Sequence, residues 1–499
     1  MELFALEDDV ARCEGHLVDA APGERLPLLL ALAWYLRQRD TTRALALAAD
    51  AEQLAGGEGQ TLARVALIRA EDAWLRSEPA EADAHAAEAR TGFETVGDQI
   101  GMGDAEWMLA SVAHDRGDRE RCSGFLAAAG MHYRAAGDAV RAACVDARQL
   151  WYAAFQDPLG TRAVLAEHFG RGGHENAVVA TWIDATRAII TDLAGDFGES
   201  SAYFIRAYRG AIRTGQWRTA VVMAANAGDK FSQLHDLASA LAWDETALAI
   251  AREAGWPGAI GQALMQTGNA FRLLGRHDQA NAHLCEAIEL MSKLSGSRNY
   301  AISLGYLGEL ALDLADYAAA LNWFRQDEDC IGIHGQPDML IGAWHGQARA
   351  LSGLGRVSEA VAKAEASLAL ARNHDNVEGQ VAALRVLADL HRSHALPAPA
   401  GASEATATLH FLTLALEAAS TIAGYVVSDE LRYGLAAEYA AIGEYKLAYE
   451  NAMLASEARE RKFNKEAHQR AIAMQMREEA GYAWDGGTCI ALHGSGLGH

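Results

Sequence analysis

The residues that could do chemistry are few and scattered through the chain. The sequence contains no Gly-x-x-x-x-Gly-Lys, His-Glu-x-x-His or Gly-x-Ser-x-Gly string, and its 18 histidines form no group with ligand spacing. Asn269 and Arg272 share one face of a predicted helix, where an amide can hold a ligand backbone and a guanidinium can clamp a carboxylate. We therefore expect binding rather than catalysis, with no metal and no cofactor.

The elements that position these residues repeat every 40 residues. Small residues recur in the middle of one predicted helix and, at the same period, in the next helix. The first series is Ala188, Gly228, Gly268, Gly308, Ala348 and Ala388, and the second is Ala240, Ala280, Ala320 and Ala360. Because helices approach each other most closely where side chains are short, both series predict stacked helical hairpins.

Two of these units resemble the tetratricopeptide repeat (TPR) most closely. They place a small residue in the first helix, a turn seven residues later, and then a spaced alanine, as in Gly308, Ala315-Asp316-Tyr317, Ala320, and in Ala436, Gly443-Glu444-Tyr445, Ala448. A period of 40 also occurs in HEAT and armadillo repeats, but this chain lacks their proline-kinked first helices. The resemblance, to the long-repeat bacterial regulator type, implies an all-α, right-handed superhelical solenoid of about eleven hairpins over residues 24–458.

The same resemblance implies which positions face the groove of the solenoid. These lie three residues before, and one and four residues after, the small residue of each first helix. Ten of them carry side chains suited to ligand binding: Trp107, Asp229, Asn269, Arg272, Glu309, His345, Arg349, Arg385, Asp389 and Arg392. Arg349, Arg385 and Arg392 are the only basic cluster on this face. A protein or peptide is the expected ligand, although most of these residues also suit a solvated polar surface.

The composition limits the classes of binding partner and the cellular compartment that we expect. The chain has 499 residues, 51% hydrophobic and 22% charged, with a formal net charge of −23. This charge argues against nucleic acid, whose phosphates require Lys and Arg. The six cysteines are far apart, residues 1–9 are acidic, and no apolar run approaches the roughly 20 residues of a membrane helix. We expect a cytoplasmic protein without membrane contact, with residues 1–23 forming an N-terminal capping helix.

The C-terminal part departs from the repeat. Residues 396–404 are rich in Pro, Gly and Ala and predict an insertion loop. Residues 459–480 predict a helix whose stripe of Phe463, Ala467, Ala471 and Met474 suits a cap, a stalk or a homodimer contact. The glycine-rich tail, 481–499, is expected to be disordered.

This ending resembles the junction between a TPR sensor and the stalk of bacterial diguanylate cyclases. The Gly-Gly-Asp/Glu-Glu-Phe motif of the cyclase domain is absent, so the resemblance implies no cyclase activity. Two hypotheses follow. The first is a non-catalytic protein- or peptide-binding sensor or scaffold in bacterial signal transduction or regulation. The alternative is the sensor portion of a TPR-linked signalling enzyme whose output domain is missing or supplied in trans.

Overall fold

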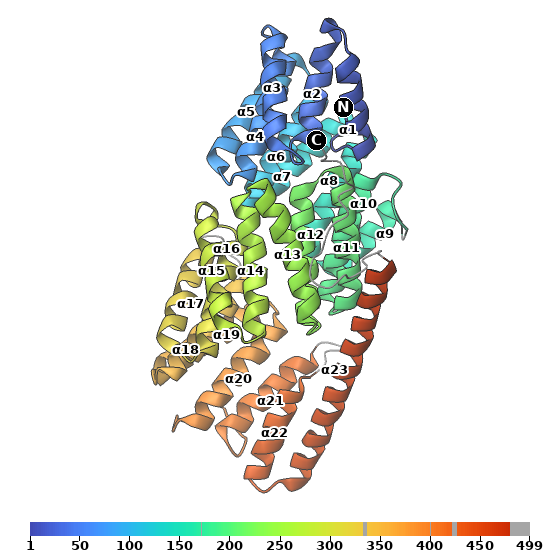
Figure 1. Cartoon of the computed structure of the whole chain (residues 1–499). Coiled ribbons are helices and arrows are strands. Elements are labelled where there is room, and N and C mark those ends of the chain that lie inside the picture. The colour runs from blue at the N-terminus through green and yellow to red at the C-terminus, as the bar shows by residue number, and fades with distance from the viewer. Residues whose placement is uncertain (171, 333–336, 400, 422–426, 480–499) are drawn as a thin grey trace. The chain divides into compact units, whose positions relative to one another are not determined.

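The computed structural model describes residues 1–170, 172–332, 337–399, 401–421 and 427–479, and within these ranges the chain contains helices and no β-strand (Figure 1). Helix α1 (Glu7–Asp19) comes first, and two 3-10 turns cover Pro22–Glu24 and Ser292–Leu294. The first helices of the hairpins are α2 (Arg25–Leu36), α4 (Gly59–Leu75), α6 (Gln99–Asp115), α8 (Ala139–Ala154), α10 (Ala177–Leu193), α12 (Trp217–Gln233), α14 (Pro257–Leu273), α16 (Arg298–Asp313), α18 (Pro337–Gly353), α20 (Val377–Ser393) and α22 (Asp429–Ala441). The second helices are α3 (Thr41–Ala55), α5 (Pro79–Val96), α7 (Arg119–Ala135), α9 (Pro158–Phe169), α11 (Phe197–Thr214), α13 (Leu237–Ala254), α15 (His277–Leu290), α17 (Tyr317–Gly332), α19 (Val357–Asn373), α21 (Ala407–Ser420) and α23 (Tyr445–Glu479). The prediction of an all-α solenoid of TPR-like hairpins is confirmed.

The turns between paired helices follow from glycine and aspartate. Gly117 ends the turn after α6 with a φ of 77°, a left-handed conformation that glycine adopts without steric cost. Asp118 then caps α7, because its carboxylate accepts a hydrogen bond from the backbone N–H of Arg121 at 3.1 Å. Asp98 and Asp138 cap α6 and α8 in the same way.

The small residues of the 40-residue series sit where the two helices of a hairpin touch. A methyl group on Gly268 would lie 2.7 Å from Leu284, and one on Gly308 would lie 2.7 Å from Phe324. In both pairs the partner comes 16 residues later, on the second helix (284 − 268 and 324 − 308). At these two positions the close helix approach therefore leaves no room for a β-carbon.

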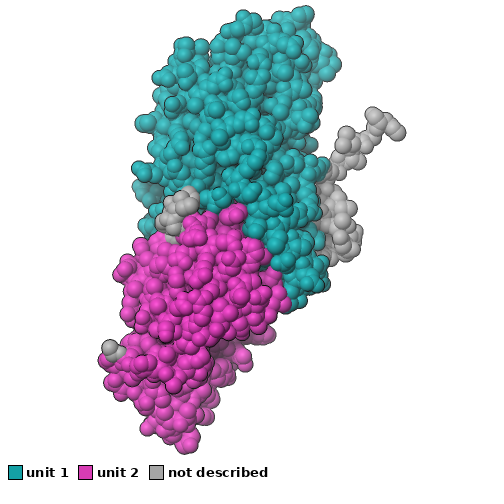
Figure 2. Space-filling view, turned by 90° about the vertical axis from the view of Figure 1, so that its left-hand side faces the viewer, with its two compact units in different colours: residues 1–297, 469–499 teal, residues 298–468 magenta. Residues whose placement is uncertain are grey.

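The chain divides into two compact units, which Figure 2 shows in different colours: residues 1–297 with 469–499, and residues 298–468. Within the first unit, segments about 180 residues apart are joined. The backbone N–H of Gly258 donates to Ser77 Oγ at 2.9 Å, and that of Arg218 donates to Gln38 Oε1 at 3.0 Å. Helices α4 and α14 are also in contact. The first helices of this unit are consequently enclosed on most sides, and every residue of α6 from Gly101 to Ala113 is buried.

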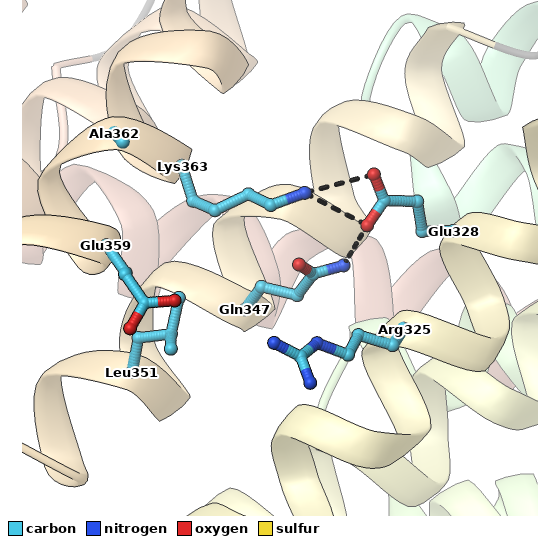
Figure 3. A pocket seen from close by; sticks show the side chains of 7 residues that line it. All are labelled: Arg325, Glu328, Gln347, Leu351, Glu359, Ala362 and Lys363. Carbon is cyan, nitrogen blue, oxygen red and sulfur yellow. Dashed lines mark hydrogen bonds and ion pairs between the residues drawn. The ribbon is translucent and has the colours of Figure 1, made fainter. Parts of the chain in front are cut away.

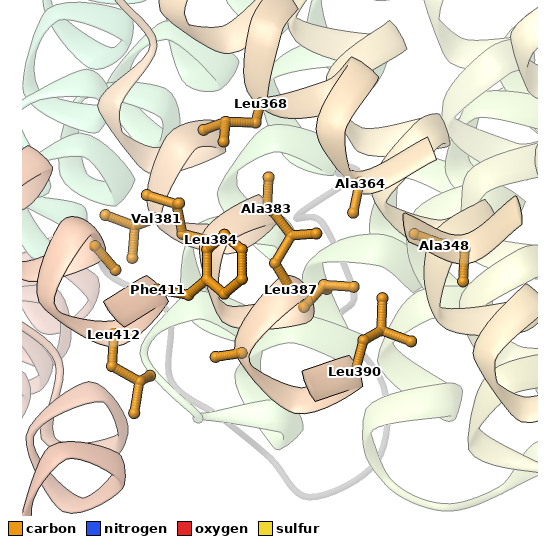
Figure 4. Close-up of a cluster of buried hydrophobic side chains, with 14 of the residues drawn as sticks. Ala348, Ala364, Leu368, Val381, Ala383, Leu384, Leu387, Leu390, Phe411 and Leu412 are labelled. Carbon is orange, nitrogen blue, oxygen red and sulfur yellow. The ribbon is translucent and has the colours of Figure 1, made fainter. Parts of the chain in front are cut away.

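The second unit has a continuous apolar core along α17 to α22. Figure 4 shows part of it, where Leu384 and Leu387 of α20 lie near Phe411 and Leu412 of α21. Ala348 of α18 and Ala364 of α19 belong to the same cluster.

The predicted end segments can be placed on the structure, although their boundaries stay predictions. Helix α1 lies within the predicted 1–23 cap, and residues 394–406 join α20 to α21 without helix in their described part. Residues 459–479 continue α23 without interruption, and Gln469 Nε2 donates to the Gly195 carbonyl at 2.9 Å. The side chains of the predicted stripe, Phe463, Ala467, Ala471 and Met474, are exposed. Residues 480–499 lie outside the described residues.

Among the helices of the described ranges, none combines the length and the apolar character needed to cross a bilayer.

Substitution of Gly308 tests the close helix contact. We expect Gly308→Ala to lower the free energy of unfolding by about 1–3 kcal/mol, because its methyl group must displace Phe324. The double variant Gly308→Ala/Phe324→Leu should recover part of this loss. Urea unfolding followed by circular dichroism measures both effects.

Gly342→Ala is the matched control, since Gly342 lies within α18 and a methyl group there meets no atom within 4 Å. It should leave stability unchanged or raise it by up to about 1 kcal/mol through helix propensity. Equal effects at Gly308 and Gly342 would contradict the proposed contact.

Candidate functional site

The segment Met1–Ala5 lies on the first helices of the first unit. It is not helical, and it bends at Leu3 and Phe4 before α1 begins at Glu7. The side chains of Leu3, Phe4 and Ala5 are almost fully enclosed, with exposed fractions of 3%, 8% and 2%. Three consecutive buried residues in a non-helical segment leave main-chain polar groups that need partners.

Side chains of α2, of the turn after it and of α8 supply those partners. The carbonyl of Glu2 accepts from Trp34 Nε1, and that of Leu3 accepts from Arg37 Nη2, each at 2.8 Å. The carbonyls of Met1 and Ala5 accept from Arg141 Nη2 and Arg39 Nη2, again at 2.8 Å. The Glu2 backbone N–H donates to the Tyr35 hydroxyl at 3.1 Å. The surface thus holds a peptide by its main chain.

Two buried carboxylates fix the guanidinium groups that make these contacts. Glu71 accepts from Arg37 Nε at 2.7 Å and from Gln38 Nε2 at 2.5 Å. Asp104 accepts from Arg64 at 2.6 Å, from Arg141 Nε at 3.2 Å and from the Tyr133 hydroxyl at 2.8 Å. The donors are therefore oriented before any peptide carbonyl arrives.

The protonation states agree with this network. Burial alone would raise the pKa of Asp104, but Arg64 and Arg141 hold it below its ordinary value. Burial lowers the pKa of Arg37, and the charge of Glu71 opposes that shift. Burial also lowers the pKa of Arg39, to about 10, so this side chain remains charged near neutral pH.

Stacking of guanidinium groups on rings completes the site. The Arg37 guanidinium lies 4.4 Å from the centre of the Phe4 ring and 3.7 Å from that of Trp34. Arg64 contacts Trp34 at 4.6 Å and Phe93 at 4.8 Å. Each contact places a cation against a π system in a buried setting, where the attraction is strong. Phe4 thus occupies an aromatic-binding position.

A pocket of about 500 Å³ adjoins this segment at Met1. Its apolar wall includes Leu26, Pro27, Leu30 and Ala31, and Arg64 contributes to its polar side. The pocket has room for side chains beyond the position of Met1.

A second cluster of the first unit contains one predicted ligand residue, Trp107. Its ring packs edge-on against Trp182 with centres 5.9 Å apart, and the Arg148 guanidinium lies 4.3 Å from its ring centre. Arg148 Nη2 also donates to Ser111 Oγ at 2.9 Å. Trp107 is therefore a buried packing residue in this structure.

The other predicted residues of the first unit bind neighbouring side chains. Asp229 pairs with Lys230 at 2.8 Å, and Lys230 also reaches Asp192 at 2.5 Å. Asn269, only 8% exposed, accepts a hydrogen bond from Arg272 Nε at 3.1 Å. The amide and guanidinium expected to clamp a ligand are bonded to each other.

In the second unit, four of the predicted residues interact with one another: Glu309, His345, Arg349 and Arg385. Arg349 Nη1 donates to both oxygens of Glu309, at 2.9 and 3.0 Å. Burial, followed by the charges of Arg349 and Arg385, lowers the pKa of His345 to about 4. Asp389 and Arg392 form a separate exposed ion pair on α20. The ten predicted residues are thus distributed over both units, and their part in ligand binding stays a prediction.

A polar pocket of the second unit lies between α17, α18 and α19 (Figure 3). Glu328 is at its centre, where Lys363 reaches both of its oxygens at 3.0 Å and Gln347 Nε2 reaches one at 2.6 Å. Arg325 and Glu359 also line the pocket. Glu328 and Lys363 are paired within the pocket, whereas Glu359 pairs with Arg356, outside its lining. In the described ranges, no group of three or more His, Cys, Asp or Glu residues could hold a metal ion.

The sequence analysis missed the residues that contact Met1–Ala5. Trp34, Arg37 and Arg39 lie in the first hairpin and Arg141 lies in α8, and all four precede the 40-residue series that begins at Ala188. The sequence signal that could have indicated this site is the presence of arginines at the end of, or within, largely apolar helices, as at Arg37 and Arg64.

Comparisons with known proteins give only distant similarities. No protein-family model matches the chain, and no curated protein matches it. A Rap protein complexed with competence and sporulation factor is 12% identical, with a TM-score of 0.49, covering 82% of this chain and 99% of that chain. The Rap conjugation gene regulator of plasmid pLS20 with the Phr* peptide is 12% identical, with a TM-score of 0.43, covering 81% and 96%. A signal transduction ATPase with a tetratricopeptide repeat sensor from Pyrococcus horikoshii is 11% identical, with a TM-score of 0.43, covering 95% and 75%. At these values, the similarities carry no argument about the ligand of this chain.

The stability of the site depends on the buried carboxylate of Asp104. We expect Asp104→Asn to lower the free energy of unfolding by about 3–5 kcal/mol, because it removes the charge that Arg64 and Arg141 share in a buried setting. Chemical unfolding measures the loss. Glu88→Gln is the control, since Glu88 is exposed and interacts only with His85. Similar stability of both variants would argue against the network.

Asp327 gives the second unit a pH dependence. Burial raises the pKa of this α17 side chain to about 7, and its Oδ1 has no hydrogen-bond partner in the described structure. A raised pKa means that the folded state favours the protonated acid, so stability is lost as pH rises from about 4 to about 7. The ionised form costs at most about 4 kcal/mol.

Asp327→Asn should therefore stabilise the chain at pH 8 and have little effect at pH 4. The difference in unfolding free energy between variant and parent, measured at several pH values, tests this expectation. Asp329→Asn, at an exposed position of the same helix, is the control. A difference that does not change with pH would refute the assignment.

Proposed function

We propose that this chain is a non-catalytic, TPR-like scaffold or sensor that binds a peptide, or a short segment of a partner protein, and acts in bacterial signal transduction or regulation in the cytoplasm. One observation carries the proposal. The first helices of the first unit already hold a non-helical peptide segment, Met1–Ala5, in the way a peptide-binding surface holds its ligand.

The nature of the contacts supports a peptide rather than a small molecule. Four consecutive or near-consecutive carbonyls, those of residues 1, 2, 3 and 5, each accept one side-chain hydrogen bond at 2.8 Å. Main-chain bonds supply affinity, while enclosed side-chain positions supply selectivity. Leu3, Phe4 and Ala5 fill such positions.

The donors are also preorganised, which reduces the entropic cost of binding. Arg37 and Arg141 are held by Glu71 and Asp104, so their remaining N–H groups point to fixed places. The pairing with carboxylates keeps these cations stable in a buried environment. A carbonyl oxygen is the acceptor that such a half-satisfied guanidinium needs.

Binding in trans tests this function. We expect a chain lacking residues 1–5 to bind a labelled peptide of residues 1–9 at a single saturable site. The Leu3→Asp and Phe4→Asp peptides should bind at least about tenfold more weakly, since each places a charge in an enclosed apolar position. Fluorescence anisotropy measures the dissociation constants.

The protein side of the contact has a matched pair of variants. Arg39→Ala removes the donor to the Ala5 carbonyl and should weaken binding by about ten- to 150-fold, the range for a hydrogen bond from a charged donor. Arg43→Ala is the control, because Arg43 pairs with Glu14 at a half-exposed site and does not contact the segment. Absence of any binding by the shortened chain, once its helical content is verified, would contradict the proposal.

A further inference from the structure

We infer that Met1–Ala5 is a self-ligand, which occupies the peptide site of the first unit and is replaced by an incoming peptide of related chemistry. This inference rests on the proposed function and specifies its ligand and its regulation. The ligand class is a non-helical peptide with a large apolar residue, an aromatic residue and a small residue in succession.

The way the segment is attached supports replacement. Helix α1 has anchors of its own, since Val10 and Cys13 pack with Leu32, Leu36 and Ala44 in one apolar cluster, to which Ala5 is the one contribution of residues 1–5. Leu6, at the start of α1, has an extended backbone with a ψ of 160°, and its side chain is exposed. Residues 1–5 can therefore leave the site while most of the α1 core remains packed.

The selectivity of the site follows from the burial of each position. Phe4 stacks against Arg37, so an aromatic ring at this position keeps a cation–π contact that an aliphatic residue would lose. Ala5 is enclosed and belongs to the apolar cluster beneath α1, which leaves space for a small side chain. Glu2 is exposed, and its side chain contributes no selectivity.

The adjoining pocket shows how an external ligand could bind better than the self-ligand. The pocket of about 500 Å³ begins at Met1 and has an apolar wall formed by Leu26, Pro27 and Leu30. A peptide with one or two apolar residues before the position of Met1 would fill this volume. Such a peptide keeps all the main-chain contacts and adds apolar burial.

The tether gives the self-ligand a kinetic and thermodynamic advantage. A segment joined to its site by a short linker has an effective concentration on the order of millimolar, so an external peptide must compete with that concentration. Occupation by residues 1–5 thus sets a threshold for the ligand. It also keeps the buried arginines hydrogen-bonded when no ligand is present.

Competition between the two peptides is the test. The labelled peptide of residues 1–9 is titrated into the full chain, into the chain lacking residues 1–5 and into the full chain with Phe4→Ala. The full chain should bind at least about tenfold more weakly than the shortened chain, and Phe4→Ala should lie between them. Asp8→Ala, at an exposed position of α1, should behave as the full chain.

A direct readout follows the segment itself. Hydrogen exchange of the Glu2 amide, which donates to the Tyr35 hydroxyl, should become faster when the full chain is saturated with the peptide. A peptide with two leucines added before Met1 should compete at lower concentration.

The outcomes separate this inference from the function on which it rests. If the full and shortened chains bind the peptide equally and Glu2 exchange is unchanged, the self-ligand is refuted while peptide binding stands. The shortened chain, the Leu3→Ala chain and the Phe4→Ala chain are also tested for peptide binding after their folding is verified. If none of the three binds the peptide, both proposals fail.

Discussion

The buried guanidinium groups of the first unit are the constraint on which its site depends. A guanidinium has five N–H donors in a fixed plane, and a buried one must find acceptors for most of them. Glu71 and Asp104 satisfy only part of this requirement for Arg37, Arg64 and Arg141. Aromatic rings lie against all three cations, and the main-chain carbonyls of residues 1 and 3 accept from two of their further donors. The buried arginines thus tie the first five residues to this surface through the main chain.

The two units use the same hairpin differently. In the first unit, contacts such as that between Gly258 and Ser77 bring distant hairpins together, so the first helices become an interior. Both units also pair equivalent positions of successive hairpins, as Arg64 does with Asp104 in the first unit and Arg349 with Glu309 in the second. Forty residues separate the partners in each pair (104 − 64 and 349 − 309). The pair is buried in the first unit and partly exposed in the second.

The sequence was sufficient to predict the architecture because the repeat is local. The spacing of Gly268 and Gly308, and the Gly-Asp turn at Gly117 and Asp118, depend on contacts within one hairpin. The candidate site was not predictable in the same way. Its partners, such as Met1 and Arg141, lie 140 residues apart, and their proximity depends on how many hairpins separate them and how the hairpins stack. The predicted pair of Asn269 and Arg272 is local instead: two polar residues three apart on one helix can bond to each other, as they do here, and their binding of a ligand stays a prediction.

Phe324 shows that the hairpins are not interchangeable. Its ring fills the space left by Gly308 in its own hairpin, and a methyl group on Gly346 of the next hairpin would also lie within 2.4 Å of it. A phenylalanine at this position thus dictates the residue type on the following unit as well as on its own. The side-chain volumes at these positions consequently restrict which hairpins can be neighbours. Gene duplication could therefore add a hairpin that carries such a phenylalanine only before a hairpin that has a small residue at the facing position.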